Sequence, residues 1–262
     1  MIFPENKSPY ILNLQHVCFS VKTGFFLKKK TILNDICLKV EHGSVVGMIG
    51  ANGAGKTTTL NLAAGILFPS SGKAFFQDMP VHALNVKKQI GYLAEIQHPF
   101  RHLKVIEWLK MLGNLSGIHG NNLTHRLEVL LDLFELNDMK QKFLHKLSKG
   151  QLQRLSFAQT LIHNPKILIL DEPMSGLDTY WRSVILACLK QYKQTGGSII
   201  FSSHVLTDVQ EIADEICCID QGRIKWTCGV EKLKEHLHTT SPNKKFKAIF
   251  QGTTESTKRA RK

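Results

Sequence analysis

The residues from Gly50 to Thr57 have the types and spacing of a phosphate-binding loop, G-x-x-x-x-G-K-[ST]. Glycines in such a loop let the backbone curl so that its N–H groups point at phosphate oxygens, and the helix that follows adds its positive end. We expect Lys56 to reach the β- and γ-phosphates of a nucleotide and the Thr57 hydroxyl to hold Mg²⁺. The residues predicted to contact the nucleotide here are Gly50, Asn52, Gly53, Ala54, Gly55, Lys56, Thr57 and Thr58.

The segments on either side of this loop favour a nucleotide site over a glycine-rich turn that binds nothing. The apolar run 45–49 predicts a buried strand that leads into the loop, and residues 57–66 predict a helix that leads out of it. Strand, loop, lysine, threonine and helix therefore occur together in the order that phosphate binding requires.

Two acids follow a second apolar run, 167–170, and they are Asp171 and Glu172. Ligands of parallel sheets bind beyond the carboxyl ends of the strands. We expect Asp171 to hold Mg²⁺, directly or through water, and Glu172 to be the general base that polarises an attacking water. The alternative is an acid pair that only caps a helix, and the phosphate loop in the same chain argues against it.

Ser148 and Gln151 have the S-x-x-Q spacing of a capping box, at the start of a helix expected to end near residue 163. One interpretation is that the pair only caps this helix. The other is that Ser148 and the helix N-terminus form an anion site aimed at a phosphate.

The remaining pattern predicts an α/β fold, because helices alternate with continuous apolar strands, which implies a parallel sheet covered on both faces. The predicted architecture is a P-loop NTPase core with a parallel sheet, an antiparallel β subdomain and an inserted α-helical subdomain. The first part of the chain is expected to form antiparallel strands within 11–49, with a basic loop at 24–30, and a short strand pair at 72–76 and 90–93. A helical insertion is expected at about 96–147, with helices at 105–112 and 123–134. The last part is expected to form strands at 167–170 and 198–201 and helices at 180–194 and from about 206.

The composition of the 262 residues, with 43% hydrophobic and 21% charged residues, is ordinary for a soluble globular protein. No apolar run approaches the roughly 18–20 residues that span a bilayer, and the first residues lack the pattern of a signal peptide, so we expect the protein in the cytoplasm. None of the six cysteines forms a C-x-x-C pair, which favours reduced thiols. The twelve histidines show no metal-ligand spacing.

The net charge of +13 is unevenly spread, because seven Lys or Arg residues and one Glu follow Ser241 in the last part of the chain. This segment is also rich in Thr and Ser, and we interpret it as a basic extension. It either keeps the protein soluble or is attracted to an anionic inner membrane leaflet.

Five motifs in this order closely resemble those of the nucleotide-binding subunits of ABC transporters, and they are Gly50–Thr58, Leu147–Gln151, Ile167–Glu172, Ser175–Asp178 and Ser203–His204. The resemblance covers most of the chain. It implies an ABC ATPase domain over 10–232, followed by the basic extension 233–262.

In that family, ATP is sandwiched between two subunits in a head-to-tail dimer. The resemblance implies that Ser148, Gly150 and Gln151 contact the ATP of the other subunit and that Asp178 communicates across the dimer. It implies that His204 contacts the γ-phosphate and takes part in catalysis with Glu172 and Lys56. The implied partners are transmembrane permease subunits at the cytoplasmic face of the membrane and a second ATP-binding subunit, expected to be identical.

The chain departs from the family at three positions. Lys149 stands where the family usually has Gly, which adds positive charge beside the expected anion site. Glu95 stands where the family usually has Gln, and its carboxylate can still coordinate Mg²⁺. The aromatic that stacks on adenine falls near Val21, which cannot stack. The aromatics that could replace it are Phe19, Phe25 and Phe26.

The sequence therefore predicts an ATP- and Mg²⁺-dependent ATPase subunit that powers transport through separate membrane subunits. Lys149, Glu95 and the short basic extension resemble those of export-type subunits, which favours export. The alternative is a non-transport ABC-type ATPase acting on the ribosome or DNA, but the chain contains one cassette and no sustained heptads, so nucleic acid is not an expected partner.

Overall fold

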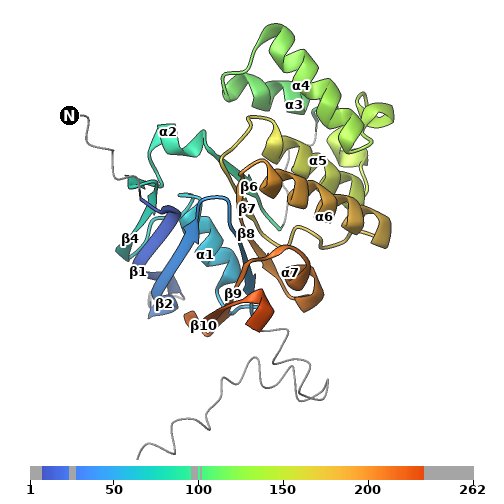
Figure 1. The fold of residues 1–262 in the computed structure, drawn as a ribbon. Coiled ribbons are helices and arrows are strands. Elements are labelled where there is room, and N and C mark those ends of the chain that lie inside the picture. Colours follow the sequence, from blue (N-terminus) through green and yellow to red (C-terminus); the bar gives the residue numbers. More distant parts are fainter. Residues whose placement is uncertain (1–7, 24–27, 96–99, 101, 233–262) are drawn as a thin grey trace, which may run out of the picture.

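The computed structural model of the protein describes residues 8–23, 28–95, 100 and 102–232, and these residues form two β-sheets with helices packed around them (Figure 1). The predicted basic extension and the two candidate aromatics Phe25 and Phe26 lie outside the described residues. No helix among the described residues is long and apolar enough to cross a membrane.

The smaller sheet has four antiparallel strands in the order β2-β1-β4-β5. Its strands are β1 (Tyr10–Thr23), β2 (Lys28–Glu41), β4 (Ser71–Phe76) and β5 (Met79–Pro80). On β2, buried and exposed residues alternate from Ile36 to Val40, as expected for a sheet with one face in the core. The predicted antiparallel subdomain is confirmed.

The larger sheet has six strands in the order β10-β9-β3-β8-β7-β6, and all neighbours are parallel except β9 and β10. Its strands are β3 (Val45–Ile49), β6 (Ile90–Leu93), β7 (Ile167–Leu170), β8 (Ser198–Ser203), β9 (Glu215–Asp220) and β10 (Arg223–Gly229). The carboxyl ends of β3, β6, β7 and β8 consequently lie along one edge. The parallel core predicted from the sequence is confirmed.

Two hydrophobic cores cover the two faces of this sheet, and alternate residues of a single strand enter different cores. On β7, Ile167 and Ile169 belong to the core shared with β1, β2 and α1 (Lys56–Ala63). Leu168 and Leu170 belong to the core shared with α5 (Lys149–Leu161), α6 (Thr179–Gln194) and α7 (Leu206–Ile212). Burial on both faces explains why these strands are continuously apolar.

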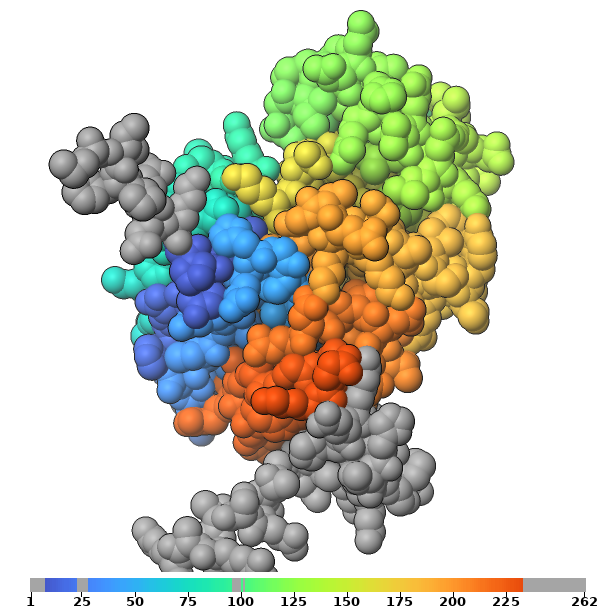
Figure 2. All heavy atoms as spheres, in the orientation of Figure 1, coloured from blue at the N-terminus to red at the C-terminus, as the bar shows by residue number. Residues whose placement is uncertain are grey.

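The helical insertion contains α3 (Val105–Leu115) and α4 (Gly120–Leu133), followed by two short 3₁₀ helices at Asn137–Met139 and Leu144–Lys146. Its buried leucines, among them Leu123 and Leu127, join the core formed with α5 and α6. The insertion is the green lobe at the top of Figure 2, away from the blue residues of the antiparallel sheet. The predicted inserted α-helical subdomain is confirmed.

Two local predictions were wrong. The strands predicted to pair at 72–76 and 90–93 belong to different sheets, because β4 pairs with β1 and β6 pairs with β7. Residues 28–30, predicted as part of a loop, are the start of β2. The sequence analysis also missed β9, β10 and the short helix α2 (Leu84–Lys87), whose patterns are brief or interrupted by charges.

Candidate functional site

A pocket of about 910 Å³ lies at the carboxyl edge of the parallel sheet, where the loops after β3, β6, β7 and β8 converge. The phosphate loop forms one wall. The residues that line the pocket are Lys30, Ile32, Gly50, Ala51, Asn52, Gly53, Gly55, Lys56, Thr57, Thr58, Glu95, Glu172, Ser175 and His204. Of the residues predicted in the loop, Ala54 alone is absent from this lining, and it is buried behind the loop.

The phosphate loop is held in a curled conformation by its own backbone and by Lys56. Gly55 has φ +112, and a Cβ atom there would lie 2.5 Å from Cδ2 of Leu33, so a side chain is excluded by both conformation and space. The Lys56 Nζ donates hydrogen bonds to the carbonyl oxygens of Gly50, at 2.8 Å, and Ala51, at 3.3 Å. The ammonium group therefore lies over the loop, at the start of α1.

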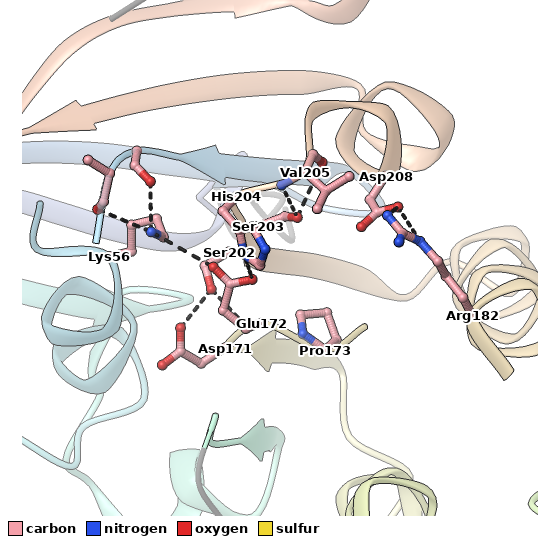
Figure 3. Close-up of polar contacts among 12 residues, drawn as sticks. Lys56, Asp171, Glu172, Pro173, Arg182, Ser202, Ser203, His204, Val205 and Asp208 are labelled. Atoms are coloured by element: carbon pink, nitrogen blue, oxygen red, sulfur yellow. Dashed lines mark hydrogen bonds and ion pairs between the residues drawn. The ribbon is translucent and has the colours of Figure 1, made fainter. Parts of the chain in front are cut away.

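The two acids after β7 are fixed by Ser202 of the neighbouring strand β8 (Figure 3). Its hydroxyl donates a 2.6 Å hydrogen bond to Oδ1 of Asp171 and accepts a 2.8 Å bond from the backbone N–H of Glu172. Glu172 has φ +48, a left-handed conformation that non-glycine residues seldom adopt. This turn directs its side chain toward the pocket while Asp171 stays fully buried.

The carboxylate of Glu172 lies between two basic groups from other loops. Its Oε2 is 2.8 Å from Nδ1 of His204, and its Oε1 is 3.8 Å from Nζ of Lys56 (Figure 3). A carboxylate in this position can be oriented by both partners and can accept a proton from a water in the pocket. Glu172 thus contacts both of the other residues predicted to be catalytic, Lys56 and His204.

One oxygen of Asp171 has the character of a cation ligand. Its Oδ2 is buried and has no hydrogen-bond partner. Among the side chains of the described residues, Oδ1 of Asn13 is the one other buried polar atom without a partner. A buried carboxylate oxygen without a partner is costly, and a hard cation would satisfy it. Thr57 and Glu95, the other predicted ligands, both line the pocket. The residues present therefore fit a magnesium ion.

Tyr92, at the end of β6, is a neighbour of this acid that the sequence analysis did not single out. Its hydroxyl donates a 2.6 Å hydrogen bond to Oδ1 of Asn61 on α1. Burial, and secondarily the charge of Asp171, raise the pKa of Tyr92 to about 12. The phenol therefore stays protonated and keeps its hydrogen bond across the neutral pH range.

Comparison with known proteins places this geometry in a family. The sequence pattern of the ABC transporter family matches residues 33–175, which include the phosphate loop and both acids after β7. An ABC transporter ATP-binding protein from Nostoc sp. is 37% identical over 215 residues, or 81% of this chain. The chain belongs to the ABC transporter family.

Other relatives and solved structures carry related names. The ABC transporter ATP-binding protein NatA of Bacillus subtilis is 33% identical, over 79% of this chain and 87% of its own length. The matched part spans only 64% of the Nostoc protein and 58% of a relative from Synechocystis sp.. The fold matches a dimeric ATP-binding cassette bound to ADP and phosphate, with a TM-score of 0.78, 21% identity and coverage of 84% of this chain and 98% of that one.

The segment of this ABC family member around Ser148 lies apart from its own phosphate pocket. Ser148 caps α5, since its hydroxyl accepts a 3.2 Å bond from the N–H of Gln151 while its own N–H donates to the Gln151 side chain at 3.0 Å. The predicted capping box is confirmed. Ser148 is exposed, and Gly150 and Gln151 are half-buried, but none of the three lines the pocket described above.

The variant residue Lys149 packs against the loop that follows Glu172. A Cβ atom added to Gly176 would lie 2.8 Å from Cε of Lys149, so the lysine stem covers this glycine. Two residues on, Asp178 caps α6 by accepting a 2.8 Å bond from the N–H of Trp181, and it is exposed. Asp178 thus does not line the phosphate pocket, and Gly176 of the same loop contacts Lys149 beside Ser148.

Of the three aromatics considered for the adenine contact, Phe19 alone is among the described residues. Phe19 packs against the hydrophobic core, and the pocket wall near the antiparallel sheet is formed by Lys30 and Ile32. Neither residue was singled out, because the sequence search was for an aromatic. Ser202 was also missed, because a serine within an apolar strand carries no motif until the neighbouring strand is known.

Proposed function

We propose that this chain binds ATP with Mg²⁺ and hydrolyses it, as the energy-supplying subunit of a membrane transporter. The observation that carries the proposal is the convergence of the phosphate loop, Lys56 and the Glu172–His204 pair on one pocket. The names of the relatives, which are ATP-binding proteins of ABC transporters, support it.

Each residue has a chemical task in this proposal. The loop N–H groups and Lys56 hold the phosphates. Glu172 accepts the proton of the attacking water, and His204 orients that carboxylate and contacts the γ-phosphate. Thr57, Asp171 and Glu95 would hold Mg²⁺, which neutralises phosphate charge when it is bound.

The active form is a head-to-tail homodimer in this proposal. Ser148, Gly150 and Gln151 do not line their own subunit's pocket, so an anion site at this helix N-terminus can serve only a nucleotide held elsewhere. A second copy that presents its phosphate loop would supply that nucleotide, with Asp178 at the contact. The structurally similar cassette bound to ADP and phosphate is named as a dimer.

The transport partner is a separate set of transmembrane subunits at the inner face of the membrane, and we propose that it exports its substrate. A relative that is 32% identical, from Cupriavidus pinatubonensis, is named a Nod factor export ATP-binding protein. Inverted membrane vesicles made with and without this chain test the direction. ATP added outside should cause a compound to accumulate in the lumen, whereas ATP-dependent loss from the lumen would indicate import.

Phosphate release from the purified chain tests the activity itself. We expect hydrolysis that requires Mg²⁺ and rises more than linearly with protein concentration, because two subunits complete each site. Co-purification of this chain with a permease from membranes, without added ATP, would support the transport role. Recovery with ribosomes or DNA instead would support the non-transport alternative.

A further inference from the structure

Away from the nucleotide pocket, His16, Asp35 and Cys37 bring an imidazole, a carboxylate and a thiol together on the antiparallel sheet. One ligand atom from each residue lies within 4.8 Å of the other two. Asp35 and Cys37 are on β2, 19 and 21 residues from His16 on β1. Sequence spacing therefore gave no sign of this cluster, and the pairing of the two strands creates it.

The strand geometry directs these side chains outward. Val17 pairs with Ile36, and both are fully buried. Because side chains alternate across a sheet, the residues on either side of this pair face the opposite, open side. The register shifts on both sides of Val17, and His16 and Asp35 have φ values of +53 and +60. Irregularities of this kind re-aim side chains, and both residue types tolerate the left-handed conformation.

The distance between the sulfur and nitrogen atoms matches that between two ligands of a tetrahedral zinc ion. Zinc lies about 2.3 Å from sulfur and about 2.0–2.1 Å from nitrogen, which separates the two ligand atoms by about 3.6 Å. The observed distance from Sγ of Cys37 to Nδ1 of His16 is 3.6 Å. Nδ1 is also 2.8 Å from Oδ1 of Asp35, a hydrogen-bond distance, so the carboxylate would shift outward by about half an ångström to share a metal.

The cluster is accessible, and its sulfur already accepts a hydrogen bond. The side chains of His16 and Asp35 are 79% and 56% exposed, so a hydrated ion can reach them. The backbone N–H of His16 donates to Sγ of Cys37 at 3.4 Å, and such bonds stabilise a thiolate ligand. The N–H of Asp35 donates in the same way to Sγ of Cys18, at 3.3 Å.

We propose that His16, Asp35 and Cys37 form a zinc-binding site, with water as the fourth ligand. Nitrogen and sulfur donors select zinc over magnesium, which prefers oxygen ligands, so the site differs in chemistry from the nucleotide site. Zinc binds the thiolate, so binding releases the proton of the Cys37 thiol. The ion would join β1 to β2 at the point where their pairing is irregular, and it would stabilise the folded chain by mass action.

Zinc titration of the full chain, freed of metal by chelator and without nucleotide, tests this site. The variants are His16→Asn and Cys37→Ser, whose new side chains are close in size to the original ones. Asparagine also tolerates the left-handed backbone conformation of residue 16. The matched controls are His125→Asn and Cys228→Ser, which change the same residue types on α4 and β10. Far-UV circular dichroism and ATP binding check that each variant is folded.

We expect the wild type and both controls to bind one zinc ion per chain and to melt at a higher temperature when zinc is added. Each site variant should bind zinc about tenfold more weakly or worse and lose that shift. Cobalt should give a thiolate charge-transfer band that the Cys37→Ser variant lacks. If wild type and site variants bind zinc equally, or if wild type takes up none, the three residues are only a surface ion pair beside a thiol.

Discussion

Nδ1 of His204 lies 2.8 Å from Oε2 of Glu172, although 32 residues separate them in the sequence. The imidazole side chain is 60% exposed, whereas the carboxylate side chain is 10% exposed. The histidine therefore reaches from the surface of the pocket to a group near its floor. This contact makes the position of the proposed base depend on the loop after β8.

Replacing Glu172 by Gln should abolish turnover while ATP binding is preserved. The amide keeps the size of the side chain but cannot accept a proton, so the rate of phosphate release should fall by about 10²–10⁴-fold. ATP-loaded dimers should then accumulate on gel filtration with ATP and Mg²⁺. A normal rate of hydrolysis in this variant would remove Glu172 from the proposed role.

Replacing Lys56 by Ala should weaken nucleotide binding itself. The change removes a charged hydrogen-bond donor from the phosphates, worth about 1.5–3 kcal/mol, so affinity for a fluorescent ATP analogue should fall about tenfold or more. The lost bonds to Gly50 and Ala51 also loosen the loop. An unchanged affinity would contradict the assignment of the phosphate loop.

Replacing Ser202 by Ala should reduce Mg²⁺-dependent hydrolysis, because the hydroxyl positions both Asp171 and Glu172. Ser198→Ala is the matched control. Ser198 is also buried on β8, and its hydroxyl accepts a 2.8 Å bond from the N–H of Gly43, away from the pocket. Both variants should lose about 1–3 kcal/mol of stability on urea unfolding. Equal loss of activity in the two would leave Ser202 a purely structural role.

Replacing Ser148 by Asp separates the two interpretations of the α5 N-terminus. Aspartate caps a helix as well as serine does, so the free energy of unfolding should change little. Its negative charge should nevertheless repel a phosphate, so hydrolysis should fall sharply while ATP still binds to the phosphate loop of the isolated subunit. If hydrolysis persists, the residue serves only as a helix cap.

The stability of the chain should decline in alkaline solution because of Cys217 on β9. Burial, and then the neighbouring Cys218 and Glu215, raise the pKa of its thiol to about 12, above the pKa of 9.0 of a cysteine thiol in an unfolded chain. The unfolded state then loses its proton first, so stability is full below about pH 9 and falls as the pH rises toward about 12. Urea unfolding between about pH 8 and pH 11 should show a shallower decline for Cys217→Ala. An identical slope would assign the effect to other groups.

The sequence predicted the parts of the site that come from contiguous motifs. The loop 50–57 and the acids Asp171 and Glu172 each combine a buried strand with polar residues at its end, and this combination is visible along one chain. Strand partners are not visible in that way. Ser202 and Ile32 reach the site through pairing and packing between segments far apart, as does the cluster of His16 with Cys37. The strands at 72–76 and 90–93 were paired wrongly for the same reason, since alternation fixes the face of a strand but not its neighbour.

The turn between β9 and β10 affects where the chain can be labelled or extended. Gly222 has φ +71, its N–H donates to the carbonyl of Ala54 at 2.8 Å, and its carbonyl accepts from the N–H of Asn34 at 2.8 Å. A Cβ atom there would lie 2.1 Å from the carbonyl oxygen of Ile32. Hairpin tips usually tolerate an affinity tag, a fluorophore or a circular-permutation cut. This tip instead joins the antiparallel sheet to the phosphate loop. A probe attached at residue 222 would therefore distort the phosphate loop that it was meant to monitor.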